Sequence, residues 1–153
     1  MRVRRFVSVL VAATVALTGA ACTTTEPGTP STGTGTVTNA PASGTTPVYG
    51  AALTAEQFRA SLAIPGVTVL DVRTPAEFAG GHLEGAQPAD INGDFEQAVA
   101  ALDRSAPYAV YCRSGNRSAT AVAVMKDLGF TNAWHLDGGI GAWQAAGYAV
   151  VKG

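Results

Sequence analysis

The stretch YAVYCRSGNRSATAVAVMKDL, residues 108–128, predicts a strand, a short loop and a helix in succession. Tyr108–Tyr111 is short and apolar, as a buried strand is. Between about Arg117 and Leu128 apolar residues recur every three or four positions, and Gly129 suits the position just after a helix. A strand followed directly by a helix is a building unit of α/β domains, so this stretch sets the expectation for the fold.

Cys112 opens the loop between the predicted strand and helix. The backbone N–H groups of a short loop and the positive end of the helix dipole can both point at a sulfur in that position. Arg113 and Arg117 add two positive charges to the same loop. We therefore expect the pKa of the thiol to lie well below its free value of about 8.5, which predicts a reactive thiolate rather than a structural cysteine.

Capping boxes mark the starts of two further helices. Thr54 is followed three residues later by Gln57, and Thr74 by Glu77, with Pro75 at the first helical position. A β-branched run suited to a buried parallel strand lies between the two boxes. In full, helices are expected from Thr54 to about Ala63, from Thr74 to Gly80, from Asp94 onward and around Trp143, and strands at Val67–Val72 and Asn132–Leu136.

Strands and helices alternate in this way across residues 48–153. The alternation predicts an α/β domain whose largely parallel sheet is flanked by helices on both faces. In such sheets ligands bind outside the carboxyl ends of the strands, and Cys112 follows Tyr111 at such an end. We therefore expect one folded domain at 48–153, with Cys112 in its binding crevice.

Residues 1–22 have the pattern of an export signal. A basic start precedes an apolar stretch at 6–17, and small residues at 19–21 lead to Cys22. The arrangement resembles a bacterial lipoprotein signal, which implies that Cys22 is lipidated and becomes the first residue of the mature protein. Ordinary cleavage before Cys22 also fits the small residues. We expect an exported protein anchored by lipid at the outer side of the cytoplasmic membrane, or otherwise periplasmic or secreted.

Residues 23–47 are nearly all Thr, Gly, Pro, Ser and Ala, without apolar periodicity. Such a segment cannot bury enough surface to offset the entropy of ordering, so we expect a disordered linker. The domain that follows, 48–153, carries ten acidic and seven basic residues. This acidic balance makes nucleic acid an unsuitable partner, while the two arginines of the cysteine loop suit a small anionic substrate.

Five motifs in order along the chain resemble the rhodanese family of sulfurtransferases. They are Asp71-Val72-Arg73, Glu77-Phe78, Gly81-His82-Leu83-Glu84-Gly85-Ala86, Cys112 to Ser118, and Gly138-Gly139-Ile140 with Trp143. The resemblance extends over nearly all of residues 51–150. It implies a rhodanese-like domain of α/β fold.

The resemblance implies sulfur transfer by covalent catalysis. Cys112 would take a sulfane sulfur from a donor such as thiosulfate and pass it from a persulfide to cyanide or a thiol acceptor, with ping-pong kinetics. Related cysteine phosphatases have Cys-x5-Arg, whereas this chain has four residues between Cys112 and Arg117. The shorter loop favours sulfur over phosphate, and the loop composition is similar to that of the thiosulfate-using members.

The substrate-binding residues implied by the resemblance are those of the loop. Arg117 is expected to contact the sulfonate of thiosulfate, with the alternative that a carboxylate holds it to brace the loop. Arg113 has a substrate-binding and a surface role as equal alternatives. The remaining loop residues are expected to act mainly through backbone donors, with Gly115 allowing a positive φ; these are Ser114, Gly115, Asn116 and Ser118.

Residues outside the loop are expected to support it. Asp71 and Arg73 end the preceding strand and predict a structural ion pair. The Gly138-Gly139 turn is expected to serve mainly in packing. No metal or other cofactor is expected, because His135 is accompanied by neither a second cysteine near Cys112 nor a closely spaced histidine.

Two functional hypotheses remain open on the sequence. The first is a thiosulfate sulfurtransferase with Cys112 as its nucleophile. The second is an extracytoplasmic persulfide carrier or interaction module that serves a protein acceptor. An open rim around Cys112 favours the protein acceptor, and a closed pocket with inward-pointing arginines favours thiosulfate.

Overall fold

The computed structural model describes residues 45–153. The predicted signal segment with Cys22, and the predicted linker up to residue 44, lie outside the described residues. Within the described part no helix is long and apolar enough to cross a bilayer. The longest helix of this part, Asn116–Asp127, has 12 residues, whereas about 20 are needed for a span.

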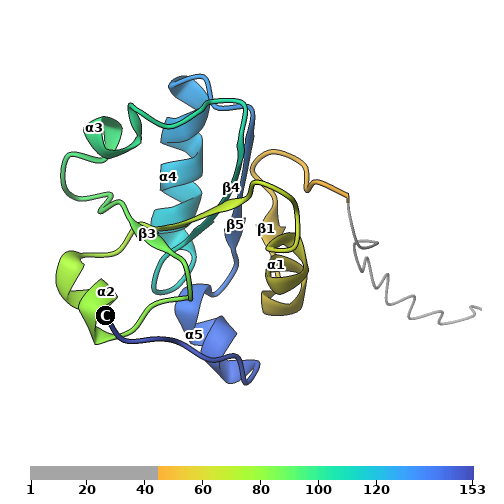
Figure 1. Ribbon diagram of the computed structural model, residues 1–153, viewed down its shortest axis with the longest axis vertical. Coiled ribbons are helices and arrows are strands. Elements are labelled where there is room, and N and C mark those ends of the chain that lie inside the picture. The colour runs from red at the N-terminus through yellow and green to blue at the C-terminus, as the bar shows by residue number, and fades with distance from the viewer. Residues whose placement is uncertain (1–44) are drawn as a thin grey trace, which may run out of the picture. The chain divides into compact units, whose positions relative to one another are not determined.

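A five-stranded parallel sheet forms the centre of the domain, in the order β1-β5-β4-β2-β3 (Figure 1). The central strand β4 contributes Tyr108, Ala109, Val110 and Tyr111, all of which are buried. Parallel strands covered on both faces need such continuous apolar runs. The strands are β1 (Ala52–Leu53), β2 (Thr68–Asp71), β3 (Gln87–Pro88), β4 (Pro107–Tyr111) and β5 (Asn132–Leu136).

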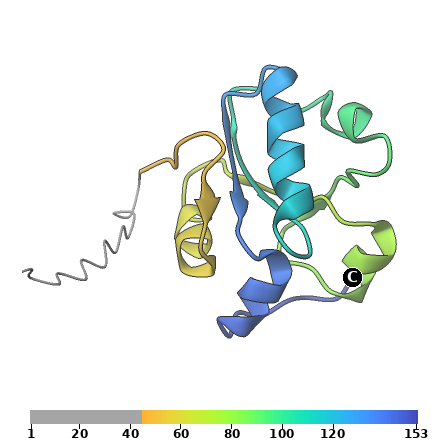
Figure 2. The same cartoon turned by 180° about the vertical axis from the view of Figure 1, so that it is seen from behind.

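Helices cover both faces of the sheet (Figures 1 and 2). On one face Val110 belongs to a buried cluster with residues of α3 and α4, and on the other Ala109 belongs to a cluster with residues of α1 and α5. The predicted α/β architecture with helices on both faces is therefore confirmed. The helices are α1 (Ala55–Ser61), α2 (Pro75–Gly80), α3 (Phe95–Val99), α4 (Asn116–Asp127) and α5 (Gly139–Ala145).

Both predicted capping boxes are present. The Thr54 hydroxyl accepts a hydrogen bond from the Gln57 N–H at 3.3 Å, and the Gln57 side chain accepts one from the Thr54 N–H at 3.1 Å. Thr74 and Glu77 make the same reciprocal pair at the start of α2. These bonds satisfy backbone donors that have no partner inside the helix, which fixes where each helix begins.

The two edge strands were absent from the sequence-based expectation. β1 pairs with β5 and β3 pairs with β2, each over two residues. A two-residue strand has no periodicity of its own, so its pairing is decided by the neighbouring strand rather than by local sequence. Edge strands this short also leave few unpaired backbone groups exposed.

Candidate active site

Cys112 lies at the carboxyl end of β4, at the start of the loop that leads into α4. It is a free thiol with no exposed surface. Gly115 precedes α4 and has a φ of 95°, a conformation that L side chains rarely adopt. This glycine turns the chain back toward the cysteine, so its own N–H points at the sulfur. Asn116, the first residue of α4, is exposed.

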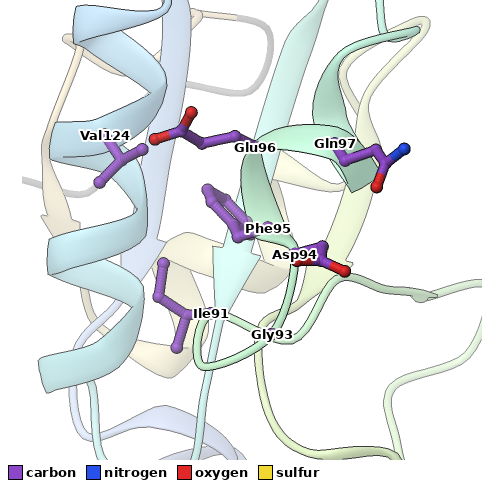
Figure 3. A pocket seen from close by; sticks show the side chains of 7 residues that line it. All are labelled: Ile91, Gly93, Asp94, Phe95, Glu96, Gln97 and Val124. Carbon is purple, nitrogen blue, oxygen red and sulfur yellow. The ribbon is translucent and has the colours of Figure 1, made fainter.

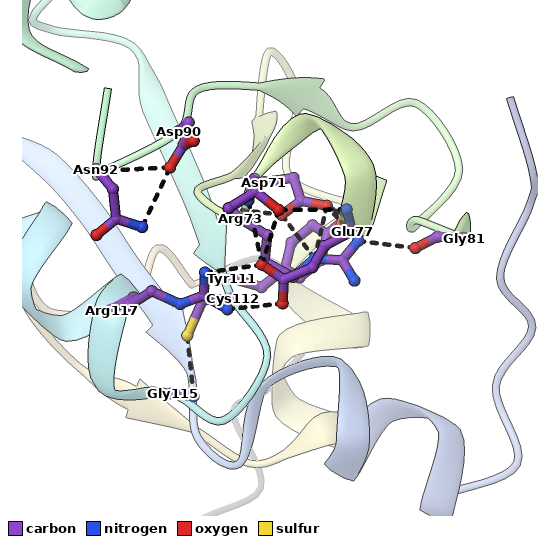
Figure 4. A network of polar contacts seen from close by, with 11 residues as sticks. Asp71, Arg73, Glu77, Gly81, Asp90, Asn92, Tyr111, Cys112, Gly115 and Arg117 are labelled. Atoms are coloured by element: carbon purple, nitrogen blue, oxygen red, sulfur yellow. Dashed lines mark hydrogen bonds and ion pairs between the residues drawn. The ribbon is translucent and has the colours of Figure 1, made fainter. Parts of the chain in front are cut away.

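Backbone donors converge on the Cys112 sulfur. The Gly115 N–H donates to Sγ with a nitrogen to sulfur distance of 3.1 Å (Figure 4). Burial raises the pKa of the thiol, but the Ser118 hydroxyl and the N–H groups of Ser118, Ser114 and Gly115 together bring the pKa below its ordinary value. The loop therefore provides hydrogen-bond donors that stabilise a thiolate.

The Ser118 hydroxyl has one proton and two acceptors within reach. Its oxygen lies 2.9 Å from the Gly115 carbonyl oxygen, and the same hydroxyl lowers the pKa of the Cys112 thiol. A hydroxyl rotates to suit its partners, so it can donate to the carbonyl when the thiol is neutral and to the sulfur when it is ionised. Ser118 is fully buried, which keeps water from competing for that proton.

The turn at Gly138 and Gly139 packs its backbone directly against the cysteine loop. The Ile140 N–H donates to the Cys112 carbonyl oxygen at 2.8 Å. A Cβ on Gly139 would overlap that same oxygen and would lie 2.5 Å from the Arg113 carbonyl carbon. The packing role expected of this turn therefore has a specific cause, since only glycine allows the two backbones to approach so closely.

Arg117 forms an ion pair with Glu77. Its Nη1 donates to Glu77 Oε2 at 2.9 Å and its Nη2 to Oε1 at 2.8 Å (Figure 4). The Arg117 guanidinium lowers the pKa of the Glu77 carboxyl to about 2. The ion pair is the contact with a carboxylate that we expected as the alternative to substrate binding by Arg117. Glu77 was not among the predicted site residues, because its place in a capping box already accounted for it.

Asp71 and Arg73 form a buried ion pair at the end of β2. Arg73 Nη2 lies 2.6 Å from Asp71 Oδ2, and Arg73 Nε donates to Oδ1 at 2.9 Å. The Tyr111 hydroxyl donates to Asp71 Oδ2 at 2.6 Å, and burial raises the pKa of that hydroxyl above its ordinary value. The carboxylate is thus satisfied by several donors, as a buried charge must be.

The same network fixes the segment that follows α2. Arg73 Nη2 donates to the Gly81 carbonyl oxygen at 2.7 Å, and the Leu83 N–H donates to the Tyr111 hydroxyl at 3.1 Å. Tyr111 directly precedes the nucleophile in the chain. The buried ion pair therefore connects β2, β4 and the segment after α2 close to Cys112.

A cavity of about 500 Å³ lies beside the cysteine loop. Its lining residues include Arg73, Glu77, Arg113, Ser114, Ile140, Gln144 and Val150. Arg113 is exposed, and within residues 45–153 its side chain has no hydrogen bond or ion pair. Arg73 and Arg117 both have carboxylate partners, so Arg113 supplies the uncompensated positive charge at this cavity.

A second cavity, of about 370 Å³, lies between residues 91–97 and α4 (Figure 3). Phe95 and Val124 line it together with Asp94 and Glu96. The described residues that line it include no cysteine, histidine or basic residue. It therefore lacks both a nucleophile and a group that would bind an anion.

The described residues contain no cluster of three His, Cys, Asp or Glu side chains that would hold a metal ion. His135 lies on β5 and is largely buried, and its Nδ1 has no hydrogen-bond partner in this part of the chain. Burial lowers the pKa of the imidazole. Burial therefore favours the neutral form of His135.

Comparison with known proteins identifies a family. The family model described as the rhodanese-like domain matches residues 54–146. The thiosulfate sulfurtransferase GlpE of Pseudomonas aeruginosa is 39% identical over 80 residues, which are 52% of this chain and 72% of that protein. GlpE of Ectopseudomonas mendocina is 38% identical over 80 residues, with the same coverage of both chains.

Solved structures agree in fold. A rhodanese-related protein of Thermoplasma volcanium is 35% identical with a TM-score of 0.58, covering 65% of this chain and 96% of that one. A thiosulfate sulfurtransferase of Pseudomonas aeruginosa is 31% identical with a TM-score of 0.59, covering 67% of this chain but 19% of the longer enzyme.

Replacing Gly139 by Ala is expected to displace the cysteine loop, because the new Cβ meets backbone atoms that cannot move aside. Gly147→Ala is a matched control, since Gly147 also has a positive φ but no atom lies within 4 Å of the place that its Cβ would take. The control should lose about 1–2 kcal/mol of stability from backbone strain alone. Urea unfolding should show a larger loss for Gly139→Ala; equal losses in the two variants would contradict the packing argument.

The Cys112 thiol is expected to ionise at a lower pH than a free cysteine, so its reactivity should disappear only as pH falls through the lowered pKa. Ser118→Ala removes a hydrogen-bond donor to the sulfur and should raise the pH at which half of the Cys112 thiol is ionised. Ser114→Ala keeps its backbone N–H and should move it little. The ultraviolet absorbance of the thiolate, with Cys112→Ser subtracted, measures the midpoint, and a wild-type value above that of a free cysteine would contradict the prediction.

Proposed function

Because this chain belongs to the rhodanese-like domain family, we propose that it is a sulfurtransferase that moves a sulfane sulfur from thiosulfate, through a persulfide on Cys112, to cyanide or a thiol acceptor. The observation that carries the proposal is the convergence of backbone donors on Sγ, with the Gly115 N–H at 3.1 Å. Donors arranged around a sulfur anion stabilise a thiolate and a persulfide alike. The similarity to proteins named thiosulfate sulfurtransferase supports the choice of donor.

The reaction consists of two displacements. The Cys112 thiolate attacks the sulfane sulfur of thiosulfate, the sulfur–sulfur bond breaks, and sulfite leaves with the electron pair. An acceptor nucleophile then attacks the outer sulfur of the persulfide, and the Cys112 thiolate leaves in turn. Atoms and electrons balance without an external oxidant, metal or cofactor, and each half-reaction is a covalent step of the ping-pong type.

Arg113 is proposed to bind the anionic end of the donor. It lines the cavity beside the loop and has no carboxylate partner among the described residues, whereas Arg117 is held by Glu77. Because Sγ has no exposed surface, the donor reaches it only when the outer loop residues move. Arg113 and Ser114 are the exposed residues next to the sulfur. Because the Arg113 backbone is held against the Gly138-Gly139 turn, their side chains are the parts proposed to move.

Transfer to a protein acceptor is the second candidate function. The cavity beside the loop is much larger than a thiosulfate ion and is bordered by the apolar side chains of Ile140 and Val150. An acceptor segment that brings a thiolate to the persulfide would fill such a space better than cyanide. The two functions share the first half-reaction and differ in the acceptor.

We also propose that the protein is exported and anchored to the membrane by lipid on Cys22. The basic start, apolar stretch and small residues before Cys22 support this. Cells that express the full chain with a fatty-acid analogue should incorporate the label, and Cys22→Ala should not. Labelling that persists in Cys22→Ala would contradict the anchor, and a processed but unlabelled wild type would indicate ordinary cleavage.

Sulfur transfer predicts a covalent adduct. After incubation with thiosulfate, intact-mass measurement should show a gain of one sulfur, about +32 Da, which cyanide removes. Cys112→Ser should show no gain. The absence of any adduct on the wild-type protein, with thiosulfate and with other sulfane donors, would contradict the proposed function.

The Arg113→Ala variant tests the donor site in the same experiment. Loss of the uncompensated charge should slow adduct formation mainly by raising the thiosulfate concentration needed for half-maximal rate. Lys126→Ala removes an exposed charge on α4 and is the matched control. An Arg113→Ala rate equal to that of the control at every thiosulfate concentration would remove Arg113 from substrate binding.

A further inference from the structure

The Glu77 carboxylate takes part in both a helix cap and an ion pair. As the third residue of α2 its Oε2 accepts a hydrogen bond from the Thr74 N–H at 3.2 Å, which completes the capping box. The same carboxylate accepts both Nη groups of Arg117, at 2.9 and 2.8 Å. Arg117 lies 40 residues further along the chain, in the first turn of α4.

The pair therefore connects two elements that flank the nucleophile. Arg117 immediately precedes Ser118, whose hydroxyl and N–H both act on the Cys112 sulfur. A bidentate contact between arginine and carboxylate restricts both the position and the orientation of the guanidinium. Holding Arg117 thus holds the first turn of α4, and with it the donors that face the sulfur.

We propose that Glu77 is a positioning residue for sulfur transfer, which acts by fixing Arg117 and the first turn of α4 so that the donors of the loop face Cys112. This inference rests on the proposed function and names a residue beyond the cysteine loop. Glu77 does not contact the sulfur, so its effect passes through Arg117.

Three negative groups act on Arg117. The groups that act on it are Glu77 from α2, the Cys112 thiolate from the loop and Asp90 from the segment before α3. Glu77 has a pKa of about 2, so it stays ionised throughout the range in which a thiol titrates. Glu77 therefore keeps its charge while Cys112 changes its own.

Gln57 in α1 provides a control for substitutions of Glu77. Gln57 has the same third position in the capping box of α1, where its side chain accepts from the Thr54 N–H at 3.1 Å. A glutamine at this position therefore supports a helix start in this protein. Glu77→Gln keeps that ability in α2 while it removes the charge that binds Arg117, and Gln57→Glu makes the reverse change in α1.

The experiment uses the full chain with Glu77→Gln, Glu77→Asp and Gln57→Glu. Positioning predicts that Glu77→Gln lowers kcat/KM for thiosulfate by about 10- to 100-fold, since small displacements of catalytic groups have effects of that size. It also predicts a higher thiol pKa, because the loop donors are less well aligned. Glu77→Asp should behave similarly, because it keeps the charge but has a shorter reach. Gln57→Glu should match the wild type in both measurements.

Other outcomes have distinct meanings. If Glu77 acted through its charge alone, the thiol pKa of Glu77→Gln would be lower than that of the wild type, because a negative group near the thiolate is removed. Glu77→Asp, which keeps the charge, would then have the thiol pKa and the kcat/KM of the wild type. Either result, or wild-type kcat/KM in Glu77→Gln, overturns the inference. The thiol pKa is measured without any sulfur donor, so an enzyme that forms no persulfide would refute the proposed function while the pKa comparison still decides the role of Glu77.

A double-variant cycle separates positioning from loss of stability. If Glu77 acts through Arg117, then Glu77→Gln should have little further effect on thiol pKa once Arg117→Met has removed the guanidinium. Additive effects of the two substitutions would contradict that route. Thermal unfolding of each variant accompanies the cycle, and the measurements are made well below the lowest transition temperature.

Discussion

The contact between the Gly138-Gly139 turn and the cysteine loop is the constraint on which the site depends. Two backbones meet there without a side chain between them, and the Ile140 N–H donates to the Cys112 carbonyl oxygen at 2.8 Å. The carbonyl side of Cys112 is thereby fixed by β5 and α5, while its sulfur faces the donors of its own loop. Because a backbone contact admits almost no adjustment, the direction of the thiol is set by the fold rather than by side-chain packing.

Carboxylates determine which positive charges remain available near the sulfur. Asp71 neutralises Arg73, and Glu77 neutralises Arg117. An unpaired guanidinium in such buried or partly buried positions would be costly, whereas a paired one braces the elements that it joins. Stabilisation of the thiolate falls to N–H groups and the Ser118 hydroxyl, whereas Arg113 at the cavity has no carboxylate partner among the described residues. The groups that stabilise the thiolate are thus distinct from the exposed cation at the cavity.

Much of the fold is predictable because its signals are local. The capping boxes of α1 and α2, the apolar runs of β2, β4 and β5, and the loop after β4 are each visible within a few residues. The edge strands β1 and β3 are not, because their two-residue pairings depend on the neighbouring strands. The link between Glu77 and Arg117 spans 40 residues, and a capping role already explained the glutamate. The Gly138-Gly139 pair was visible as a turn, but its contact with Cys112 requires the packed sheet.

The cysteine loop has a buried part and an exposed part. Gly115 and Ser118 are buried and supply donors to the sulfur, whereas Arg113 and Ser114 are exposed and border the cavity, and the Ser114 N–H is a further donor. The Arg113 backbone is held against the Gly138-Gly139 turn, so the freedom of the exposed part lies in its side chains. The buried part continues into the first turn of α4, and Arg117 in that turn is held by Glu77.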